Sequence, residues 1–407
     1  MVRSRIPRVR HMRALRASVL MGALVSVALL GSGWSSAPIT RTASPSDVVS
    51  KIAPASAPCS NASKGAGQVA ALWKRDEQAL GVPVLKPPAS SVCYVDTSSY
   101  KKRGPYTIAF ASQGPTNAWA SESDAYVRYV AKQNHVKLLY ASANGSGATQ
   151  VGEIPSLLAQ NPQLLMVQPL SSGVEPGLHR AALRHIPVVV CTGLLTDTND
   201  ITATVNRSYA LDGTIMAQWV AKKIGGKGQV AMLSGIAGVP TAEYTYQAGL
   251  AVFKHFPGIK IVTHQYTNWS PSQAKTVAAS MLVEYPNIKA IWSDSASNDE
   301  GVIAAYTAAH KAIPPLTGDS PNLLLKLAKQ YHVQFAVSAY PPEQCGEALA
   351  VAVKILEGKS VPNQIPVNSA VYTNKQLAKY YRPSCSVNLY VPSLLPLSIL
   401  RQLKLCP

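Results

Sequence analysis

Short apolar runs alternate with longer stretches of helical periodicity over most of the chain, from residue 106 to residue 358. The first run, at 107–111, reads TIAFA; it follows a Gly104-Pro105 turn and ends on small and polar residues at 112–114. A continuous apolar run of this kind is typical of a strand buried on both faces of a parallel sheet. Ligands bind at the carboxyl ends of such strands, so we expect residues 112–119 to face a ligand.

The alternation forms two successive blocks of similar plan. The first block is expected to hold strands at 107–111, 136–140, 164–168 and 186–190, with helices at 119–133, at 149–160 and around His179. The second block is expected to hold strands at 229–233, 259–266, 290–294 and 333–338, with helices at 213–224, 242–255, 271–285, 299–310, 322–330 and 345–356. Strands that alternate with helices in this way predict an α/β protein with doubly wound parallel sheets.

Residues 1–37 carry the three-part pattern of a secretory signal peptide. Residues 1–16 contain six arginines and no acidic residue, an apolar stretch follows at 17–30, and small residues follow up to Ala37. The alternative is an uncleaved anchor, for which the apolar stretch is short compared with the about 20 residues that cross a bilayer. Residues 38–103 are expected to form a linker and a small accessory segment with a short helix at 69–80.

The composition and the distribution of charge indicate which kinds of binding partner the protein can have. Of the 407 residues, 47% are hydrophobic and only 14% are charged, which suits a globular protein with buried parallel sheets. The net charge is +18, but six of the positive charges lie in the first 37 residues and the rest are spread along the chain. Nucleic-acid binding requires a clustered basic face, so we expect no nucleic-acid partner.

Six cysteines in an exported chain favour disulfides. Cys59 and Cys93 bracket the segment before the first block, and Cys385 and Cys406 bracket the tail, so we expect these two local pairs. The remaining two, at 191 and 345, lie within the α/β blocks and are expected to be free, buried thiols. No CxxC occurs and no cysteine–histidine cluster has zinc-like spacing, so no metal site is expected.

Several motifs of the two blocks occur in the order and spacing of a known family. They are the Ile-Pro-Val-Val-Val run at 186–190, the Gly-Gly-Lys-Gly turn at 225–228, and the segments at 233–238, 298–300, 318–319 and 342–346. Over residues 104–362 the chain thereby resembles the type I periplasmic sugar-binding proteins of ABC importers, the group that includes ribose-binding protein.

The resemblance implies two doubly wound α/β lobes joined by a three-segment hinge, with a ligand held in the cleft between them. The N-terminal lobe would comprise residues 104–205 and 341–370, and the C-terminal lobe with the tail would comprise 206–340 and 371–407. Hinge motion would close the lobes on a small molecule, and an ABC permease would recognise the closed form. We expect an exported monomer, located in the periplasm or cell envelope.

The resemblance places five ligand contacts in the first block: Ser112, Asn117, Trp119, Gln168 and Thr192. The indole of Trp119 can stack on a sugar ring, or it can begin a helix and pack against its own lobe. The side-chain amide of Gln168 offers both a donor and an acceptor to hydroxyl groups. Sugar binders of the family carry an Asp-Arg pair at the end of the fourth strand, whereas this chain has Cys-Thr-Gly at 191–193.

The resemblance places the contacts of the second block at Ile236, Tyr246, Trp269, Asn298, Asp319 and Tyr340. Trp269 would face Trp119 across the cleft, and Asp294 competes with Asn298 for one position. Asp319 has a second interpretation as the N-cap of a helix. No arginine occurs between Arg207 and Arg382, which disfavours a carboxylate or charged sugar as the ligand. A neutral polyol, an aromatic compound or an unusual sugar fits better.

The leading function is a solute receptor of an ABC importer, without catalytic residues and without a cofactor. The alternatives are a ligand-sensing subunit for a membrane signalling partner and, less well supported, an enzyme. The enzyme hypothesis is disfavoured because the eight histidines are scattered and the HExxH, GxSxG, dinucleotide and Walker patterns are all missing from the sequence.

Overall fold

The computed structural model describes residues 94–195, 197–367 and 370–407. The predicted signal peptide, the helix at 69–80 and the Cys59–Cys93 pair lie outside the described residues. Within the described ranges, no helix is long and apolar enough to cross a membrane.

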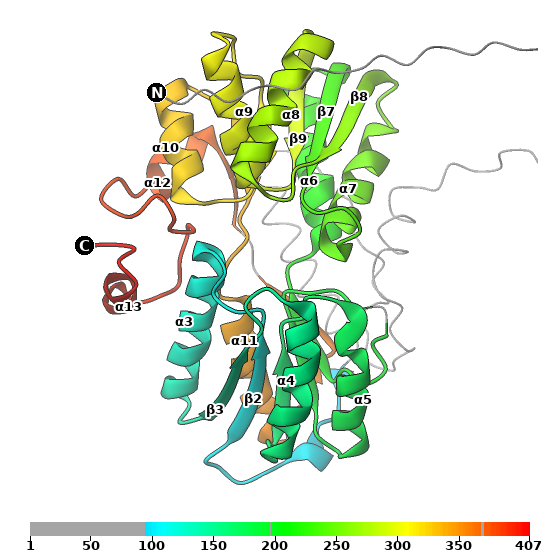
Figure 1. Ribbon diagram of the computed structural model, residues 1–407, viewed down its shortest axis with the longest axis vertical. Helices are drawn as coiled ribbons and strands as arrows, with labels where there is room; N and C mark the ends of the chain where they lie inside the picture. Colours follow the sequence, from blue (N-terminus) through cyan, green and yellow to red (C-terminus); the bar gives the residue numbers. More distant parts are fainter. Residues whose placement is uncertain (1–93, 196, 368–369) are drawn as a thin grey trace, which may run out of the picture. The chain divides into compact units, whose positions relative to one another are not determined.

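A six-stranded, all-parallel sheet forms the centre of what we call the N-terminal lobe (Figure 1). Its order is β13-β6-β5-β4-β2-β3. The strands are β2 (Thr107–Ser112), β3 (Lys137–Ser142), β4 (Leu164–Val167), β5 (Val188–Cys191), β6 (Ala203–Asn206) and β13 (Gln364–Pro366). Successive side chains of a strand point to opposite faces, so Ile108 and Phe110 join one apolar cluster while Ala109 and Ala111 join another.

Helices cover both faces of this sheet. The first cluster contains residues of α3 (Ala118–Gln133) and α11 (Gln344–Leu356). The second contains residues of α4 (Gly147–Ala159) and α5 (Glu175–Leu183). Because both faces are buried, the central strands read as continuous apolar runs rather than as alternating ones.

The C-terminal lobe repeats this plan with the strand order β14-β11-β10-β9-β7-β8. The strands are β7 (Lys227–Ser234), β8 (Gly258–Tyr266), β9 (Ile288–Ser293), β10 (Leu316–Gly318), β11 (Phe335–Ser338) and β14 (Val371–Thr373), which alone runs antiparallel to its neighbour. One face packs on α6 (Tyr209–Lys223) and α7 (Pro240–Phe253). The other packs on α8 (Pro271–Glu284), α9 (Ala296–Ala308) and α10 (Asn322–Tyr331). The predicted architecture of two doubly wound α/β lobes is thus confirmed.

The chain crosses between the two sheets three times. It leaves the N-terminal sheet after β6, returns after β11, and leaves again between β13 and β14. A separate two-stranded antiparallel pair joins β1 (Tyr94–Val95) to β12 (Val361–Pro362). After β14 the chain continues as a C-terminal tail that holds the 3-10 turn η3 (Asn374–Gln376), α12 (Leu377–Tyr380) and α13 (Leu397–Gln402).

The disulfides confirm one cysteine prediction and correct another. Cys385 and Cys406 are bonded, as expected for a local pair that closes the tail. Cys191 and Cys345 are not free thiols; they form a disulfide with a Cα–Cα distance of 5.2 Å. A local sequence pattern could not reveal this bond, because 154 positions separate its two cysteines. Only the packing of the first turn of α11 against the end of β5 brings them together.

Candidate functional site

The candidate site lies at the carboxyl ends of the strands where each sheet reverses its order. In the N-terminal lobe, β2 lies between β3 and β4, so the direction of winding changes between β2 and β4. In the C-terminal lobe, β7 lies between β8 and β9, so the same change falls between β7 and β9. Open α/β sheets bind their ligands in the crevice at such a switch point.

Both switch points carry the same hydrogen-bond arrangement. The residue that follows β4 is Gln168, and its Oε1 accepts from the backbone N–H of Gln113 at 3.3 Å. The residue that follows β9 is Asp294, and its Oδ2 accepts from the backbone N–H of Gly235 at 3.0 Å. Gln113 and Gly235 each follow the first strand of their lobe. One buried polar side chain per lobe therefore fixes the backbone that borders the crevice.

Gln168 retains a donor for a ligand. Its side chain is buried, and its Nε2 makes no hydrogen bond to any described residue. Its backbone carbonyl is occupied by Gln150, whose Nε2 donates to it at 2.7 Å. A buried donor without a partner is costly, so a ligand hydroxyl that accepts from this amide would stabilise the complex.

Trp269 is held in place by the close approach of a glycine. A Cβ atom on Gly235 would lie 1.8 Å from Cε2 of the Trp269 indole, so only glycine allows the ring to rest there. The indole Nε1 donates to Oδ1 of Asp294 at 3.2 Å. Trp269 also has φ of 49°, an uncommon left-handed conformation for a bulky residue. Such backbone strain is found preferentially at functional sites.

Trp119 belongs to an aromatic group at the second crossover. Its ring stacks on Tyr340 with centroids 4.8 Å apart, and its Nε1 donates to the Tyr340 backbone carbonyl at 2.9 Å. The Tyr340 hydroxyl lies 3.1 Å from that of Tyr209. The guanidinium of Arg207 lies over the Tyr340 ring at 4.2 Å. Trp119 lies in the first turn of α3 and packs on another predicted contact, Tyr340, whereas its stacking on a ligand stays a prediction.

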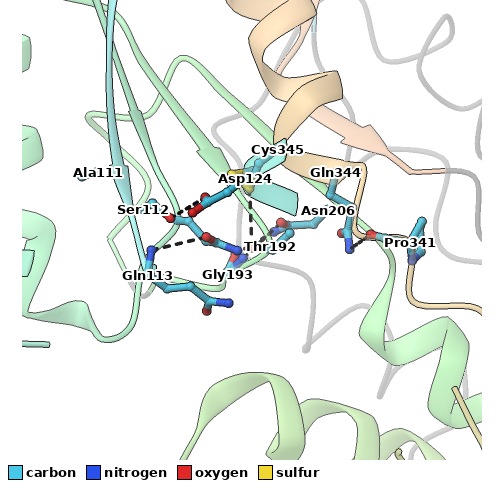
Figure 2. Close-up of a disulfide and its surroundings, with 12 residues drawn as sticks. Ala111, Ser112, Gln113, Asp124, Thr192, Gly193, Asn206, Pro341, Gln344 and Cys345 are labelled. Atoms are coloured by element: carbon cyan, nitrogen blue, oxygen red, sulfur yellow. Dashed lines mark hydrogen bonds between the residues drawn. A yellow bond between two sulfur atoms is a disulfide. The ribbon is translucent and has the colours of Figure 1, made fainter. Parts of the chain in front are cut away.

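The end of β5 is held by an unusual backbone conformation and by hydrogen bonds from β6 (Figure 2). Thr192 has φ of 53°, an outlier for a β-branched residue, and its Oγ1 lies 3.8 Å from Cys345 Sγ. The amide of Asn206 holds the next residue, Gly193, by donating to its carbonyl at 2.6 Å and accepting from its N–H at 3.2 Å. Figure 2 shows Thr192, Gly193 and Asn206 among the surroundings of the disulfide.

Ser112 is also drawn in Figure 2, and its hydroxyl already makes two hydrogen bonds. It donates to Asp124 Oδ1 at 2.8 Å and accepts from the backbone N–H of Gly114 at 2.9 Å. In this arrangement Ser112 shapes the loop after β2.

Asn298 and Asp319 are buried in the C-terminal lobe and hold its loops. Asn298 Nδ2 donates to Asp294 Oδ1 at 3.1 Å, and its Oδ1 accepts from the Thr267 hydroxyl. Asp319 Oδ1 accepts from the backbone N–H of Ala296, the first residue of α9, at 2.6 Å. Asp319 therefore binds the start of α9 rather than capping the helix that follows it in sequence. Asp294, the alternative to Asn298 as a ligand contact, accepts a hydrogen bond from Asn298, so both side chains belong to one hydrogen-bond network.

Three predicted residues have surroundings of another kind. Asn117 is exposed and caps α3 through the backbone N–H of Ala120. Ile236 is 41% exposed. Tyr246 stacks on His264 with ring centroids 3.6 Å apart. Their contact with a ligand stays a prediction, as it does for the other site residues.

Sequence reasoning missed Arg207 and the residues around it. Arg207 is buried, its Nε lies 2.7 Å from Asp212 Oδ2, and its Nη1 donates to the Ser338 carbonyl at 3.2 Å. Its backbone N–H donates to Gln344 Oε1 at 2.9 Å. The side chain thus links the first crossover to the second. Apart from its place after Asn206 at the end of the first block, nothing in the sequence marks Arg207 for this role.

Two carboxyl groups of the C-terminal lobe, Asp294 and Glu300, are influenced by the charge of Asp319. Burial raises the pKa of Asp294 to about 7, although hydrogen bonds from Gly235 and Trp269 oppose this shift. Burial also raises the pKa of Glu300 to about 7, with a further contribution from Asp319. Near neutral pH both carboxyl groups are therefore partly protonated.

Asp294 should make the unliganded protein less stable as the pH rises. Its pKa is about 7 in the folded protein against an ordinary value of 3.8. The stability that this group contributes is therefore fully present below about pH 4 and is lost as the pH rises to about 7. Asp294→Asn removes that loss, so between pH 5 and 8 the melting temperature of the wild type should fall about 5 °C further than that of the variant. Parallel pH dependences in thermal denaturation would contradict the assignment.

Among the described residues, no group of three or more His, Cys, Asp or Glu side chains could hold a metal ion. The crevice instead offers amides, carboxyls and aromatic faces. This is the chemistry of hydroxyl-rich ligands.

A family model described as periplasmic binding protein domain matches residues 108–360. The chain belongs to this family. The resemblance in sequence to type I periplasmic binding proteins is thereby confirmed, and both crevices described above lie within the matched residues.

Individual relatives agree with this assignment. The chain is 26% identical over 219 residues to the galactofuranose-binding protein YtfQ of Escherichia coli, covering 53% of this chain and 69% of the relative. It is 24% identical over 298 residues to the ribose import binding protein RbsB of Bacillus subtilis, covering 72% of this chain and 93% of the relative. A solved ABC transporter periplasmic solute binding protein from Actinobacillus succinogenes with bound D-allose aligns with a TM-score of 0.61 and 25% identity, covering 68% of this chain and 100% of that one.

Proposed function

We propose that this protein captures a sugar or a related neutral polyol between its two lobes and delivers it to an ABC importer. The observation that carries the proposal is the pair of matched switch points. Gln168 holds the loop after β2 in one lobe, and Asp294 holds the loop after β7 in the other. The family assignment supports solute capture, and the relatives named above support a sugar as the class of solute.

The polarity of the crevice favours a neutral ligand. Arg207 is the one arginine between residues 185 and 381, and it is occupied by Asp212 and by a backbone carbonyl. Arg207 therefore offers no free guanidinium to a ligand carboxylate. Trp269 offers an apolar ring face beside the hydrogen-bonding groups, which matches the two-sided character of a sugar.

The family assignment also supports delivery of the ligand to a permease in the membrane. The protein acts outside the cytoplasm as a monomer, is exported by its N-terminal signal peptide, and carries out no chemical step on the ligand. Hinge motion about the three crossovers distinguishes the loaded from the empty receptor for the permease.

A panel of neutral sugars, sugar acids and polyols tests the proposal by thermal shift and tryptophan fluorescence. At a concentration 100 times its Kd, a true ligand should stabilise the protein by about 2.7 kcal/mol, which corresponds to a rise of at least about 5 °C in melting temperature. Mass analysis of the ligand after prolonged incubation should recover it unchanged. Conversion of the ligand by the purified protein, or stabilisation by sugar acids alone, would contradict the proposal.

A further inference from the structure

The C-terminal tail, residues 374–407, is built into the C-terminal lobe. The backbone N–H groups of Asn322 and Leu323 donate to the carbonyls of Leu389 and Val387 at 2.7 and 2.8 Å. The apolar side chains of the tail are buried in the same cluster as α9 and α10: Leu389, Val391, Leu395, Leu400 and Leu405. The tail therefore moves with this lobe.

Two carboxyl groups of the N-terminal lobe bind the backbone of this tail. Glu122 lies on α3, and its Oε1 accepts from the N–H of Tyr390 at 3.1 Å. Glu343 directly precedes α11, and its Oε1 accepts from the N–H of Leu394 at 2.6 Å. The two contacts lie four tail residues apart and come from α3 and from the residue before α11 in the other lobe.

Both carboxyl groups are buried, at 0% and 1% exposure for Glu122 and Glu343. The Oε2 atom of Glu122 has no hydrogen-bond partner among the described residues. Burial raises the pKa of Glu122 to about 9, and the neighbouring Glu343 raises it further. Glu122 is therefore protonated at neutral pH, and its carbonyl oxygen binds the tail without an uncompensated buried charge.

The face of α3 that carries Glu122 also contacts the hinge. Trp119 and Tyr126 lie three residues before and four residues after Glu122, so the three share one face of the helix. Trp119 donates to the carbonyl of Tyr340 in the second crossover. Tyr126 is buried in the same apolar cluster as the tail leucines, and its hydroxyl donates to Glu347 at 3.3 Å. One helix face thus meets both a crossover and the tail.

The tail also borders the segments that bend when the lobes move. A cavity of about 300 Å³ is lined by Ala339 and Pro341 of the second crossover, by Ile365 of β13, and by Pro392 and Leu394 of the tail. Glu343 lines the same cavity. The contacts of the tail with the N-terminal lobe therefore lie next to the hinge.

From these contacts we infer that Glu122 and Glu343 are positioning residues that anchor the C-terminal tail across the hinge. The tail then forms a fourth connection between the lobes, in addition to the three crossovers, and limits how far they separate. The consequence for ligand affinity rests on the proposed function; the restraint on lobe motion does not. Removal of the anchors shifts the population of lobe arrangements toward wider separations, and ligand affinity changes by the same population factor.

Two measurements on the full chain without ligand test the restraint. Hydrogen exchange at the amides of Tyr390 and Leu394 reports the two contacts directly. Distances between spin labels, introduced through non-natural amino acids at the exposed Lys132 and Lys254, report lobe separation without disturbing the cysteines. In the double variant Glu122→Leu with Glu343→Leu, both amides should exchange at least tenfold faster, and the distance distribution should broaden toward longer values.

Three further variants separate anchoring from general destabilisation. The Gln pair, Glu122→Gln with Glu343→Gln, keeps the acceptor oxygens and should restore slow exchange and the narrow distribution. Glu284→Leu removes an exposed carboxyl at the end of α8, which accepts a hydrogen bond from the neighbouring Tyr285, and should leave both readouts unchanged. The Asp pair, Glu122→Asp with Glu343→Asp, shortens both side chains without adding apolar bulk and should repeat the effect of the Leu pair if that variant does not fold. A folded Leu or Asp pair with wild-type exchange and wild-type distances would overturn the inference.

Discussion

Replacing both Cys191 and Cys345 by alanine should lower the free energy of unfolding by about 5 kcal/mol. The disulfide spans 154 positions, and a cross-link that closes so long a loop removes a large part of the chain entropy of the unfolded state. Both sulfurs are also completely buried, so the loss leaves a packing defect between β5 and α11. The melting temperature should fall by at least about 10 °C.

The second disulfide provides the matched comparison. Cys385 and Cys406 are 21 positions apart, so Cys385→Ala with Cys406→Ala should cost about 3 kcal/mol, less than the long-range pair. Thermal denaturation of wild type and both double variants, with and without reductant, measures the difference. If reductant lowered the melting temperature of the Cys191–Cys345 double variant as much as that of the wild type, the long-range bond would not be the main source of the effect.

Replacing Trp269 by alanine should weaken binding of the ligand found in the panel by at least about 30-fold, which corresponds to about 2 kcal/mol. The indole gives the crevice its apolar ring face, and its N–H holds Asp294 in place. Alanine removes both, and the Asp294 carboxylate then keeps its hydrogen bonds from Gly235 and Asn298. Titration calorimetry at fixed pH measures the change.

Two control variants show whether the ring itself is responsible. Trp269→Phe keeps an aromatic face over Gly235 and should lose less than a third of the binding energy lost in the alanine variant. Tyr331→Ala removes an exposed aromatic side chain at the end of α10 and should leave affinity unchanged. Wild-type affinity in Trp269→Ala would place the ligand elsewhere and would leave the fold assignment intact.

Most of the fold could be predicted from the sequence because its signals are local. The first apolar run at 107–111 forms β2, and the expected helix at 119–133 forms α3 with one further residue at its start. Parallel strands buried on both faces leave a period-free apolar run that is easy to recognise. The short strand β10 was harder to predict, because Leu316–Gly318 is only three residues long and ends in a turn motif.

The hydrogen-bond partners of the candidate site residues could be predicted only in part, because many of them are distant in sequence. Gln168 was proposed from the family resemblance at the end of an expected strand, and Asp294 only as a competitor of Asn298; their contact with a ligand stays a prediction. The role of Arg207 was not predicted, because its hydrogen-bond partners come from α6, β11 and α11. No sequence pattern near residue 207 indicates these partners. The same reason explains the wrong prediction for Cys191 and Cys345, whereas the local pair Cys385–Cys406 could be predicted from spacing.

The path of the chain makes one lobe an insertion within the other. β5 and β6 are made early, yet α11 and β13, which complete the same sheet and its covering, are made only after β7 to β11. The N-terminal lobe therefore cannot finish folding until nearly the whole polypeptide is available. A proteolytic cut anywhere between residues 192 and 344 would leave two fragments that the Cys191–Cys345 bond still joins.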